Sequence, residues 1–274
     1  MFNFTHKTPI EWPSEPQIMA ILNLTPDSFF AQSRLNNIQS ILDKTALFIQ
    51  EGASIIDIGG QSTRPGATMI SVEEEIDRIV PAIKAISSTF PTIAISVDTF
   101  QSKVAEVALE AGASIINDIS CGTFDPTILD IVAKYQSGYI GMYITGNKDS
   151  MHFIPERNNI ITDLITFFNQ KKELLSNLGI DNWVIDPGFG FGKSIQENFT
   201  LIKELKQLEI IGLPILVGVS RKSSIYKTLD ITADEALNGT TVVNSIALQN
   251  GASILRVHDV KEAKQAIKLM SYLK

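Results

Sequence analysis

The 274-residue sequence is poor in cysteine, in long apolar runs and in basic residues, and each shortage excludes a class of protein. Its single cysteine, Cys121, cannot form an intrachain disulfide, which favours a reducing compartment. The longest apolar runs, such as Ile211–Val219, contain glycine and proline and are too short to span a bilayer. The segment Met1–Lys7 lacks the apolar region of a signal peptide. We therefore expect a cytoplasmic protein without a membrane partner.

The charge balance is acidic. Lysine and arginine number 23 against 30 aspartates and glutamates, which gives a net charge of −7. Non-specific nucleic-acid binding needs a basic face, so no nucleic-acid partner is expected, although a local site can still bind a small anion. His6 and His152 show no metal-ligand spacing, and no zinc site built by the protein is predicted. Cys121 has no neighbour that resembles a supporting base, which favours a small semi-buried residue over a nucleophile.

An internal repeat indicates the architecture. The segment Gly52–Asp57 recurs as Gly112–Asn117 and again as Gly251–Arg256. Each copy follows a helical pattern, begins with a glycine suited to a helix C-terminus, continues as a short β-branched run and ends in a polar or charged residue. The repeat is therefore interpreted as a helix end, a tight turn and a buried strand.

The same rhythm predicts eight strands separated by helices. The apolar runs do not alternate with polar residues, as expected of parallel strands buried on both faces; they are Ile18–Leu22, Ile55–Ile58, Ile93–Val97, Ile115–Ile116, Tyr139–Ile144, Trp183–Ile185, Ile215–Val217 and Ile254–Val257. Capping boxes at Ser71 with Glu74 and at Thr232 with Glu235 predict two helix starts.

Eight such units in a chain of this length predict a single α/β domain over residues 1–274. A (β/α)8 TIM barrel typically needs about 250 residues, and residues 1–16 are expected to be an irregular lead-in. A doubly wound open sheet is the alternative fold, which eight evenly spaced units fit less well.

Polar side chains end six of the eight predicted strands. They are Asn23, Asp57, Asp98, Asn117, Asp186 and Arg256. A single aspartate after a strand is usually a helix cap, but six together are expected to converge at the C-terminal mouth of the barrel, where active sites of this fold lie.

Three loops after predicted strands suggest anion binding. Ser62–Gly66 offers hydroxyl groups and an arginine held by proline and glycine, although a solvated surface loop would have the same composition. Ser220–Ser224 opens a helix whose free N–H groups favour a carboxylate or phosphate. Arg256 and His258 lie two residues apart and are expected to face the same side of a strand.

The segment Gly188–Ser194 resembles a phosphate-binding P-loop but fails its pattern. A P-loop needs a glycine five residues before Gly192, where this chain has Pro187. The segment is instead interpreted as a flexible loop that carries an aromatic side chain into the site.

Together these segments resemble the dihydropteroate synthases of the folate pathway. The resemblance extends from Ile18 to about Val260, and its blocks follow the family's order: Ile21–Phe29, Asp57–Gly66, Ser96–Thr99, Asn117–Ile119, Asp186–Lys193, Ser220–Ser223 and Arg256–Asp259. It implies a transferase that condenses 6-hydroxymethyl-7,8-dihydropterin pyrophosphate with p-aminobenzoate, giving 7,8-dihydropteroate and pyrophosphate. It also implies Mg²⁺ as cofactor, small molecules as partners, a homodimer, and inhibition by sulfonamides that mimic p-aminobenzoate.

The resemblance assigns the candidate residues. Catalytic roles fall to Asp98, Lys222, Asn23, Arg256 and Thr63. The pterin is expected to contact Asp98, Asn117, Ile119, Met142, Asp186, Lys222 and Arg256. Pyrophosphate is expected to contact Asn23, Thr63, Arg64, Arg256 and His258, with Asn23 also holding Mg²⁺. The aminobenzoate pocket is assigned to Thr63, Pro65, Phe191, Ser223 and Phe29.

The implied chemistry begins with the leaving group. An aniline is a weak nucleophile, so pyrophosphate is expected to depart before the amine attacks, eased by Mg²⁺ and cations that take its charge. Asp98 can stabilise the resulting pterin-methylene cation, and no strong general base is required.

Some positions depart from the family pattern, and two rival functions follow. Phe30–Ser33 replaces an acidic, glycine-containing loop, Tyr143 replaces a histidine and Lys148 a proline. A pterin-binding methyltransferase domain would share the pterin residues but would need neither Ser62–Gly66 nor Ser220–Ser223. A catalytically silent barrel is disfavoured by the intact polar residues, although the atypical loop after Phe29 leaves it open.

Overall fold

Eight parallel strands alternate with helices along the chain in the computed structural model, which describes residues 12, 14–24, 34–62 and 66–273, without the side chains of residues 34–37. The strands are β1 (Gln17–Asn23), β2 (Ile55–Gly59), β3 (Ala94–Asp98), β4 (Ile115–Asp118), β5 (Gly138–Met142), β6 (Val184–Asp186), β7 (Leu216–Val217) and β8 (Ile254–Val257). Each overlaps a strand predicted from the sequence. The predicted lead-in lies largely outside the described residues.

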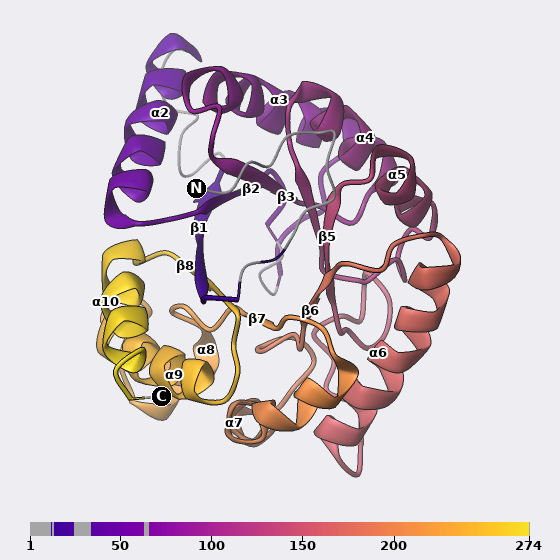
Figure 1. The fold of residues 1–274 in the computed structure, drawn as a ribbon, viewed down its shortest axis with the longest axis vertical. Helices are drawn as coiled ribbons and strands as arrows, with labels where there is room; N and C mark the ends of the chain where they lie inside the picture. Colours follow the sequence, from indigo (N-terminus) through magenta and orange to yellow (C-terminus); the bar gives the residue numbers. More distant parts are fainter. Residues whose placement is uncertain (1–11, 13, 25–33, 63–65, 274) are drawn as a thin grey trace.

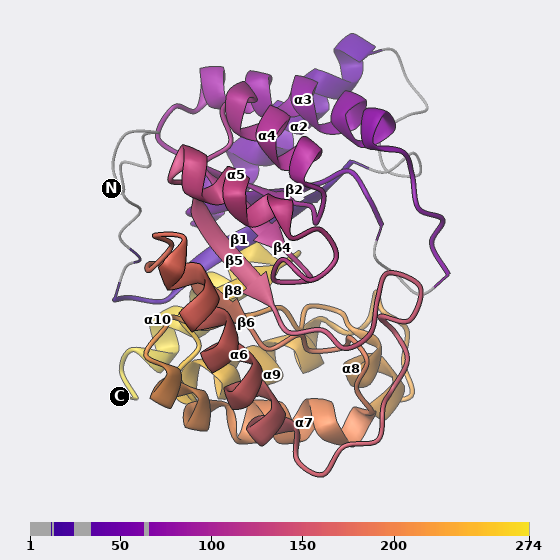
Figure 2. The same cartoon turned by 90° about the vertical axis from the view of Figure 1, so that its right-hand side faces the viewer.

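Helices surround the strands. They are α2 (Arg34–Glu51), α3 (Val72–Thr89), α4 (Ser102–Ala111), α5 (Thr127–Tyr135), α6 (Ile160–Asn177), α7 (Ile195–Lys203), the 3₁₀ helix η1 (Leu205–Ile211), α8 (Ser223–Thr228), α9 (Leu237–Gln249) and α10 (Val260–Met270). Figure 1 shows them as a ring around the strands. From the side, the strands lie between α3–α5 above and α7–α9 below (Figure 2). Among the helices in the described part of the chain, none combines the length and apolar character needed to cross a membrane.

The strands form a nearly closed barrel, which confirms the predicted TIM-barrel fold. Their order is β6-β5-β4-β3-β2-β1-β8-β7, and every neighbouring pair is parallel. Between β6 and β7, an isolated bridge pairs Ile185 with Ile215. An open doubly wound sheet would leave these two strands as distant edges, so the alternative fold is excluded.

The three copies of the repeat adopt one structure. Gly52, Gly112 and Gly251 have φ values of +107°, +119° and +98°, which a residue with a Cβ rarely adopts. The alanine after each glycine donates its N–H to the helix carbonyl five residues earlier, closing the helix end. The next serine N–H donates to the neighbouring strand, in the pairs Ser54–Ile18, Ser114–Ile95 and Ser253–Ile215. The repeat is thus the device that ends a helix and starts a strand in register.

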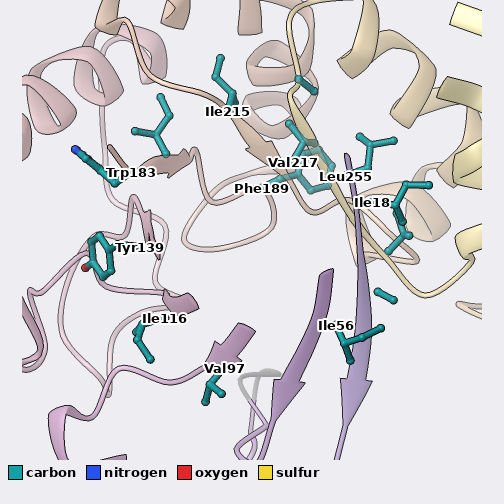
Figure 3. Packing of buried hydrophobic residues seen from close by; sticks show 14 of the residues in the cluster. Ile18, Ile56, Val97, Ile116, Tyr139, Trp183, Phe189, Ile215, Val217 and Leu255 are labelled. Atoms are coloured by element: carbon teal, nitrogen blue, oxygen red, sulfur yellow. The ribbon is translucent and has the colours of Figure 1, made fainter. Parts of the chain in front are cut away.

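Two apolar layers stabilise the barrel. The inner layer takes one buried side chain from each strand: Met19, Ile55, Ala94, Ile115, Ile140, Val184, Leu216 and Ile254. Trp12 packs against it. The outer layer lies between strands and helices, and Figure 3 shows part of it, including Tyr139, Trp183 and Phe189. Because the inner layer fills the barrel, polar groups can gather only beyond it.

One of the two predicted helix starts is wrong. Ser71 caps α3, and its hydroxyl accepts the N–H of Glu74 at 3.1 Å. At the second position α9 begins only at Leu237. The Thr232 hydroxyl donates to the Glu235 carboxylate at 2.8 Å instead of accepting an N–H, so the pair closes a turn before the helix. A reciprocal capping box that was not predicted starts α7, between Ser194 and Glu197.

Candidate functional site

A polar layer lies two residues beyond the inner apolar layer. Successive side chains of a strand point to opposite faces, so the residue two positions after each inner-layer residue faces the same way. These positions are Ile21, Asp57, Ser96, Asn117, Met142, Asp186, Gly218 and Arg256. The strands therefore bring Asn117, Asp186 and Arg256 to the predicted mouth, together with Asp98, whose register partner on β4 is Asn117.

Arg256 is the centre of this layer. Its Nε donates to Asp57 Oδ2 and its Nη2 to Asp98 Oδ2, each at 2.6 Å. Asn117 Nδ2 donates to the same Asp57 oxygen at 3.2 Å. Gly218, at the corresponding position after β7, lies beside the arginine: a Cβ there would be in ordinary van der Waals contact, 3.7 Å from Arg256 Cβ. The two carboxylates, the guanidinium and the amide form one connected group across four strands.

The repeat explains how these groups meet. Asp57, Asn117 and Arg256 are the last residues of its three copies, and in the structure they contact one another directly. Asp57 is fully buried, and its Oδ1 has no hydrogen-bond partner among the described residues. No role was predicted for Asp57 beyond ending a strand. Its equivalence to Asn117 and Arg256 within the repeat is the signal that could have revealed one.

Burial sets the protonation of Asp98. It raises the pKa of this carboxyl to about 7, although the Arg256 guanidinium opposes the shift. Asn23 ends β1 beside it: a Cβ on the intervening Gly59 would lie 3.5 Å from Asn23 Oδ1 and 3.7 Å from Asp98 Cβ. An amide oxygen and a carboxylate that titrates near neutrality thus face the same small gap.

Asp186 and Lys222 form the opposite side of the mouth. Asp186 Oδ1 accepts the N–H of Gly188 at 2.7 Å, and Lys222 Nζ donates to the carbonyl of Phe189. The Lys222 ammonium also lies 4.8 Å from the ring centroid of Phe191. Burial raises the pKa of Asp186 and lowers the pKa of Lys222 to about 8, and each charge partly offsets the shift of the other.

The loop after β6 is held by side chains on several sides. Lys193 Nζ donates to the carbonyls of Gly188 at 2.8 Å and Phe191 at 3.0 Å. Arg157 Nη2 donates to the carbonyl of Gly192 at 2.7 Å. The sequence suggested a flexible loop, whereas the structure shows one whose carbonyl groups are tied to its surroundings. The aromatic side chain that it was expected to present is Phe191.

Two consecutive pairs tie the loop after β7 to the loop after β8. Ser220 Oγ lies 3.0 Å from His258 Nδ1, and the Arg221 guanidinium binds both oxygens of Asp259 at 2.9 Å. Arg221 has a φ of +53°, a conformation that this bidentate pair helps to hold. Lys222 and Ser223 follow directly, and α8 begins at Ser223 as predicted.

Apolar side chains cover one side of the mouth. Ile119 and Met142 belong to one buried cluster with Phe100, Ile144 and Met151, and Phe191 packs against it. His152 stacks on Phe191 with 5.8 Å between ring centroids. A flat apolar wall beside a set of fixed polar groups suits a planar heterocycle with its own donors and acceptors.

Two departures from the family pattern lie behind this wall and at its rim. Tyr143 belongs to the outer layer, where its ring packs edge-on against Phe167 with 5.1 Å between centroids. Lys148 is exposed, with Nζ 4.9 Å from the ring centroid of Phe100 at the rim. Lys148 therefore alters the packing at the rim, whereas the Tyr143 ring also lies 4.9 Å from the Lys193 ammonium that holds the loop after β6.

The structure brings together Asn23, Asp98, Asn117, Ile119, Met142, Asp186, Phe191, Lys222, Ser223, Arg256 and His258 at or beside the mouth. Phe29, Thr63, Arg64, Pro65 and the atypical loop Phe30–Ser33 lie outside the described residues. Within the described part of the chain, no group of three histidine, cysteine, aspartate or glutamate side chains is placed to hold a metal ion.

Comparisons with known proteins agree with this geometry. The family model described as "Pterin binding enzyme" matches residues 19–258. The chain is 40% identical to a dihydropteroate synthase of Synechocystis sp., over 97% of this chain and 93% of that protein. A Yersinia pestis dihydropteroate synthase solved with a sulfonamide drug complex is 38% identical, with a TM-score of 0.88 and coverage of 95% and 94%. The Clostridium difficile enzyme, solved in the presence of pteroic acid, is 33% identical, with a TM-score of 0.90 and coverage of 96% and 98%.

Arg256→Met tests whether the guanidinium neutralises the two carboxylates. Removing one partner of a buried ion pair leaves uncompensated charge, so we expect the free energy of unfolding to fall by roughly 3–5 kcal/mol at pH 8. This loss of unfolding free energy should become smaller towards pH 5, because a protonated carboxyl group carries no charge for the arginine to compensate. The folded variant binds more protons than the folded parent, so its stability rises relative to the parent as the pH falls. Urea unfolding at both pH values measures this, and Lys103→Met, which breaks an exposed pair, should change nothing measurable. An equal loss at both pH values would contradict the assignment.

Proposed function

We propose a mechanism for this chain on the premise that it belongs to the pterin-binding enzyme family. It is a dihydropteroate synthase, a transferase of folate biosynthesis that joins the methylene carbon of a dihydropterin pyrophosphate to the amine of p-aminobenzoate. The observation that carries this conclusion is the convergence of Asp98, Asn117, Asp186 and Lys222 around the apolar wall at the barrel mouth.

The pterin is read by the strand ends. Its amino and ring N–H groups match the carboxylates of Asp98 and Asp186, and its ring acceptors match the Asn117 amide and the Lys222 ammonium. Ile119 and Met142 pack against the ring. A site built to hydrogen-bond a substrate rejects analogues that lack the partner groups, because its own buried polar groups would be left unpaired. This half of the pocket rests on strands and is formed before any substrate arrives.

Pyrophosphate and Mg²⁺ belong at the β1 and β8 side. Asn23 Oδ1 suits Mg²⁺, which prefers oxygen ligands and commonly keeps waters while binding substrate phosphates. With no dedicated acidic cluster in the described part of the chain, the ion would share its coordination between Asn23, water and the pyrophosphate itself. Bound there, Mg²⁺ would offset the charge of the leaving group. Arg256 and His258 add donors for the phosphates, with Thr63 and Arg64.

The bond between the methylene carbon and the pyrophosphate oxygen breaks first, and pyrophosphate leaves with the electron pair. The cation left on the pterin methylene is stabilised by the ionised carboxylate of Asp98. The amine of p-aminobenzoate then attacks the methylene carbon, a C–N bond forms, and the amine releases a proton to solvent. Because the cation is a strong electrophile, the weak aniline nucleophile needs no general base.

The aminobenzoate lies between two loops. Phe191, on the loop after β6, supplies the ring contact, and Ser223, after β7, receives the carboxylate. Phe29, Thr63 and Pro65 complete the pocket. Sulfonamides share the aniline ring and an acidic group in place of the carboxylate, so they occupy this pocket in competition with p-aminobenzoate.

Pyrophosphate release tests the whole assignment. The purified chain, mixed with the pterin pyrophosphate, p-aminobenzoate and Mg²⁺, should release one pyrophosphate per dihydropteroate formed, measured by a coupled phosphate assay and chromatography. Omitting p-aminobenzoate should stop product formation because it removes the nucleophile. Chelating Mg²⁺ should do so because the charge of the leaving pyrophosphate is then not offset. A folded chain that binds pterin yet forms no product would establish the silent-barrel alternative.

Lys222 and Asp98 should give a bell-shaped pH profile of kcat/KM for the pterin substrate. Ionised Asp98 is lost as pH falls through about 7, and the Lys222 ammonium is lost as pH rises through about 8. Lys222→Ala should lower kcat/KM roughly 30- to 1000-fold, on the scale of a charged hydrogen bond, and remove the alkaline limb. The control is Lys227→Ala, an exposed lysine on the helix α8 that follows Lys222. An alkaline limb that persists in Lys222→Ala would assign it to another group, such as Lys193.

We also propose a cytoplasmic homodimer that pairs through α9. This helix carries no charged residue, and its Val242 and Ile246, four residues apart, are 51% and 40% exposed. The single buried cysteine suits a reducing compartment. Val242→Glu should reduce the sedimenting mass from twice 30.1 kDa to 30.1 kDa, whereas Leu47→Glu, at an exposed site on α2, should not. A parent that already sediments as a monomer would exclude the dimer.

A further inference from the structure

Asn198 lies beneath the aminobenzoate pocket without being part of it. It occupies the second turn of α7, is 1% exposed, and belongs to no segment that the sequence linked to chemistry. A buried carboxamide carries one acceptor and two donor hydrogens, each of which must find a partner or cost free energy. The partners of Asn198 therefore show what the residue does.

One end of the amide holds the loop that presents Phe191. Asn198 Oδ1 accepts the N–H of Gly190 at 2.7 Å. Gly190 has a φ of +85° and stands between Phe189, whose carbonyl accepts from Lys222, and Phe191 itself. This bond holds the N–H of the middle residue of the turn that presents Phe191, whereas Lys193 holds the carbonyls of Gly188 and Phe191 on either side.

The other end holds the start of α8. Asn198 Nδ2 donates to Ser224 Oγ at 3.0 Å, as well as to the carbonyl of Ser194 at 2.9 Å within its own helix. Ser224 is 3% exposed and directly follows Ser223, the residue to which the substrate carboxylate is assigned. The Asn198 amide thus contacts both the start of α8, beside the residue assigned to the substrate carboxylate, and the loop that presents Phe191.

We propose that Asn198 is a positioning residue that fixes the distance between the two walls of the aminobenzoate pocket. The proposal rests on the proposed function, since the pocket is assigned through it. A planar amide sets both the direction and the spacing of its two contacts, and the smaller or apolar side chains cannot replace both. After loss of the amide, the bond from Lys222 to the Phe189 carbonyl still joins the Phe191 loop to the α8 start, but their spacing should be held less tightly, which weakens binding of a rigid molecule that must touch both. The pterin half, built on strand ends, should not respond.

The test compares Asn198→Ala, Ser224→Ala and the double variant with Asn244→Ala, a control that removes another buried asparagine from α9. The KM for each substrate and the sulfonamide inhibition constant are measured, with folding checked by circular dichroism. We expect Asn198→Ala to raise the KM for p-aminobenzoate and the sulfonamide constant together, by roughly 5- to 30-fold for the loss of one or two buried hydrogen bonds. The KM for the pterin substrate should stay within about twofold, on the additivity expected of independent sites.

The double variant measures the energetic coupling between Asn198 and Ser224, which is the most specific test of the proposal. If the amide acts through Ser224, the double variant should be less impaired than the product of the two single effects. Asn198→Asp keeps an acceptor for Gly190, and the Ser224 hydroxyl can donate to its second oxygen, so this variant should be milder than Asn198→Ala. If Asn198→Ala fails to fold, Asn198→Asp and Ser224→Ala, the two milder variants, carry the same test.

Equal increases in both KM values, or an unchanged KM for p-aminobenzoate in folded variants, would overturn the positioning role. So would a control Asn244→Ala that shows the same selective loss. Failure of the proposed function gives a different result, because the parent chain would then release no pyrophosphate from the two substrates. The two hypotheses therefore fail in distinguishable ways.

Discussion

The pairing of Arg256 with Asp57 and Asp98 is the interaction on which the mouth of this barrel depends. Buried charges are tolerable only when they are compensated, and here one guanidinium hydrogen-bonds two carboxylates at once, which leaves one net negative charge when both are ionised. The strands that carry them come from opposite ends of the chain, so the layer exists only once the barrel has closed. The charged side chains at the proposed site are therefore also the ones that join β8 to β2 and β3, so the site forms when the barrel closes.

Much of the architecture was accessible from the sequence because buried parallel strands leave a plain signal. The three repeat copies and the remaining apolar runs located all eight strands, and the strand-end rule located Asp98, Asn117, Asp186 and Arg256. What local patterns could not supply was partnership across the chain. Arg256 and Asp57 are 199 residues apart, and Asn198 meets Ser224 only through tertiary packing. The start of α9 was misplaced for a related reason, because a threonine hydroxyl can donate as well as accept, and the sequence pattern does not distinguish the two.

The two halves of the site are built differently. The half proposed to bind the pterin consists mainly of side chains at strand ends, whose spacing is imposed by backbone pairing and by the filled inner layer, with Lys222 added from the loop after β7. The aminobenzoate half consists of loops whose carbonyl and N–H groups are held by side chains from α7 and from the loops themselves. Backbone ladders yield little to substitution, whereas side-chain ties can be changed one at a time. A single substitution is therefore expected to change the geometry of the half proposed for the second substrate more readily than that of the half proposed for the pterin.

The barrel is a split ring. Seven of its joints are ladders, but β6 meets β7 through one isolated bridge between Ile185 and Ile215. The loops that leave these two strands are the ones that hold Phe191 and Ser223, so the pocket proposed for p-aminobenzoate lies above this junction. Because this junction is a single bridge rather than a ladder, the strands beneath the proposed p-aminobenzoate pocket are aligned less by backbone pairing than by the buried side chains and the loop contacts around them.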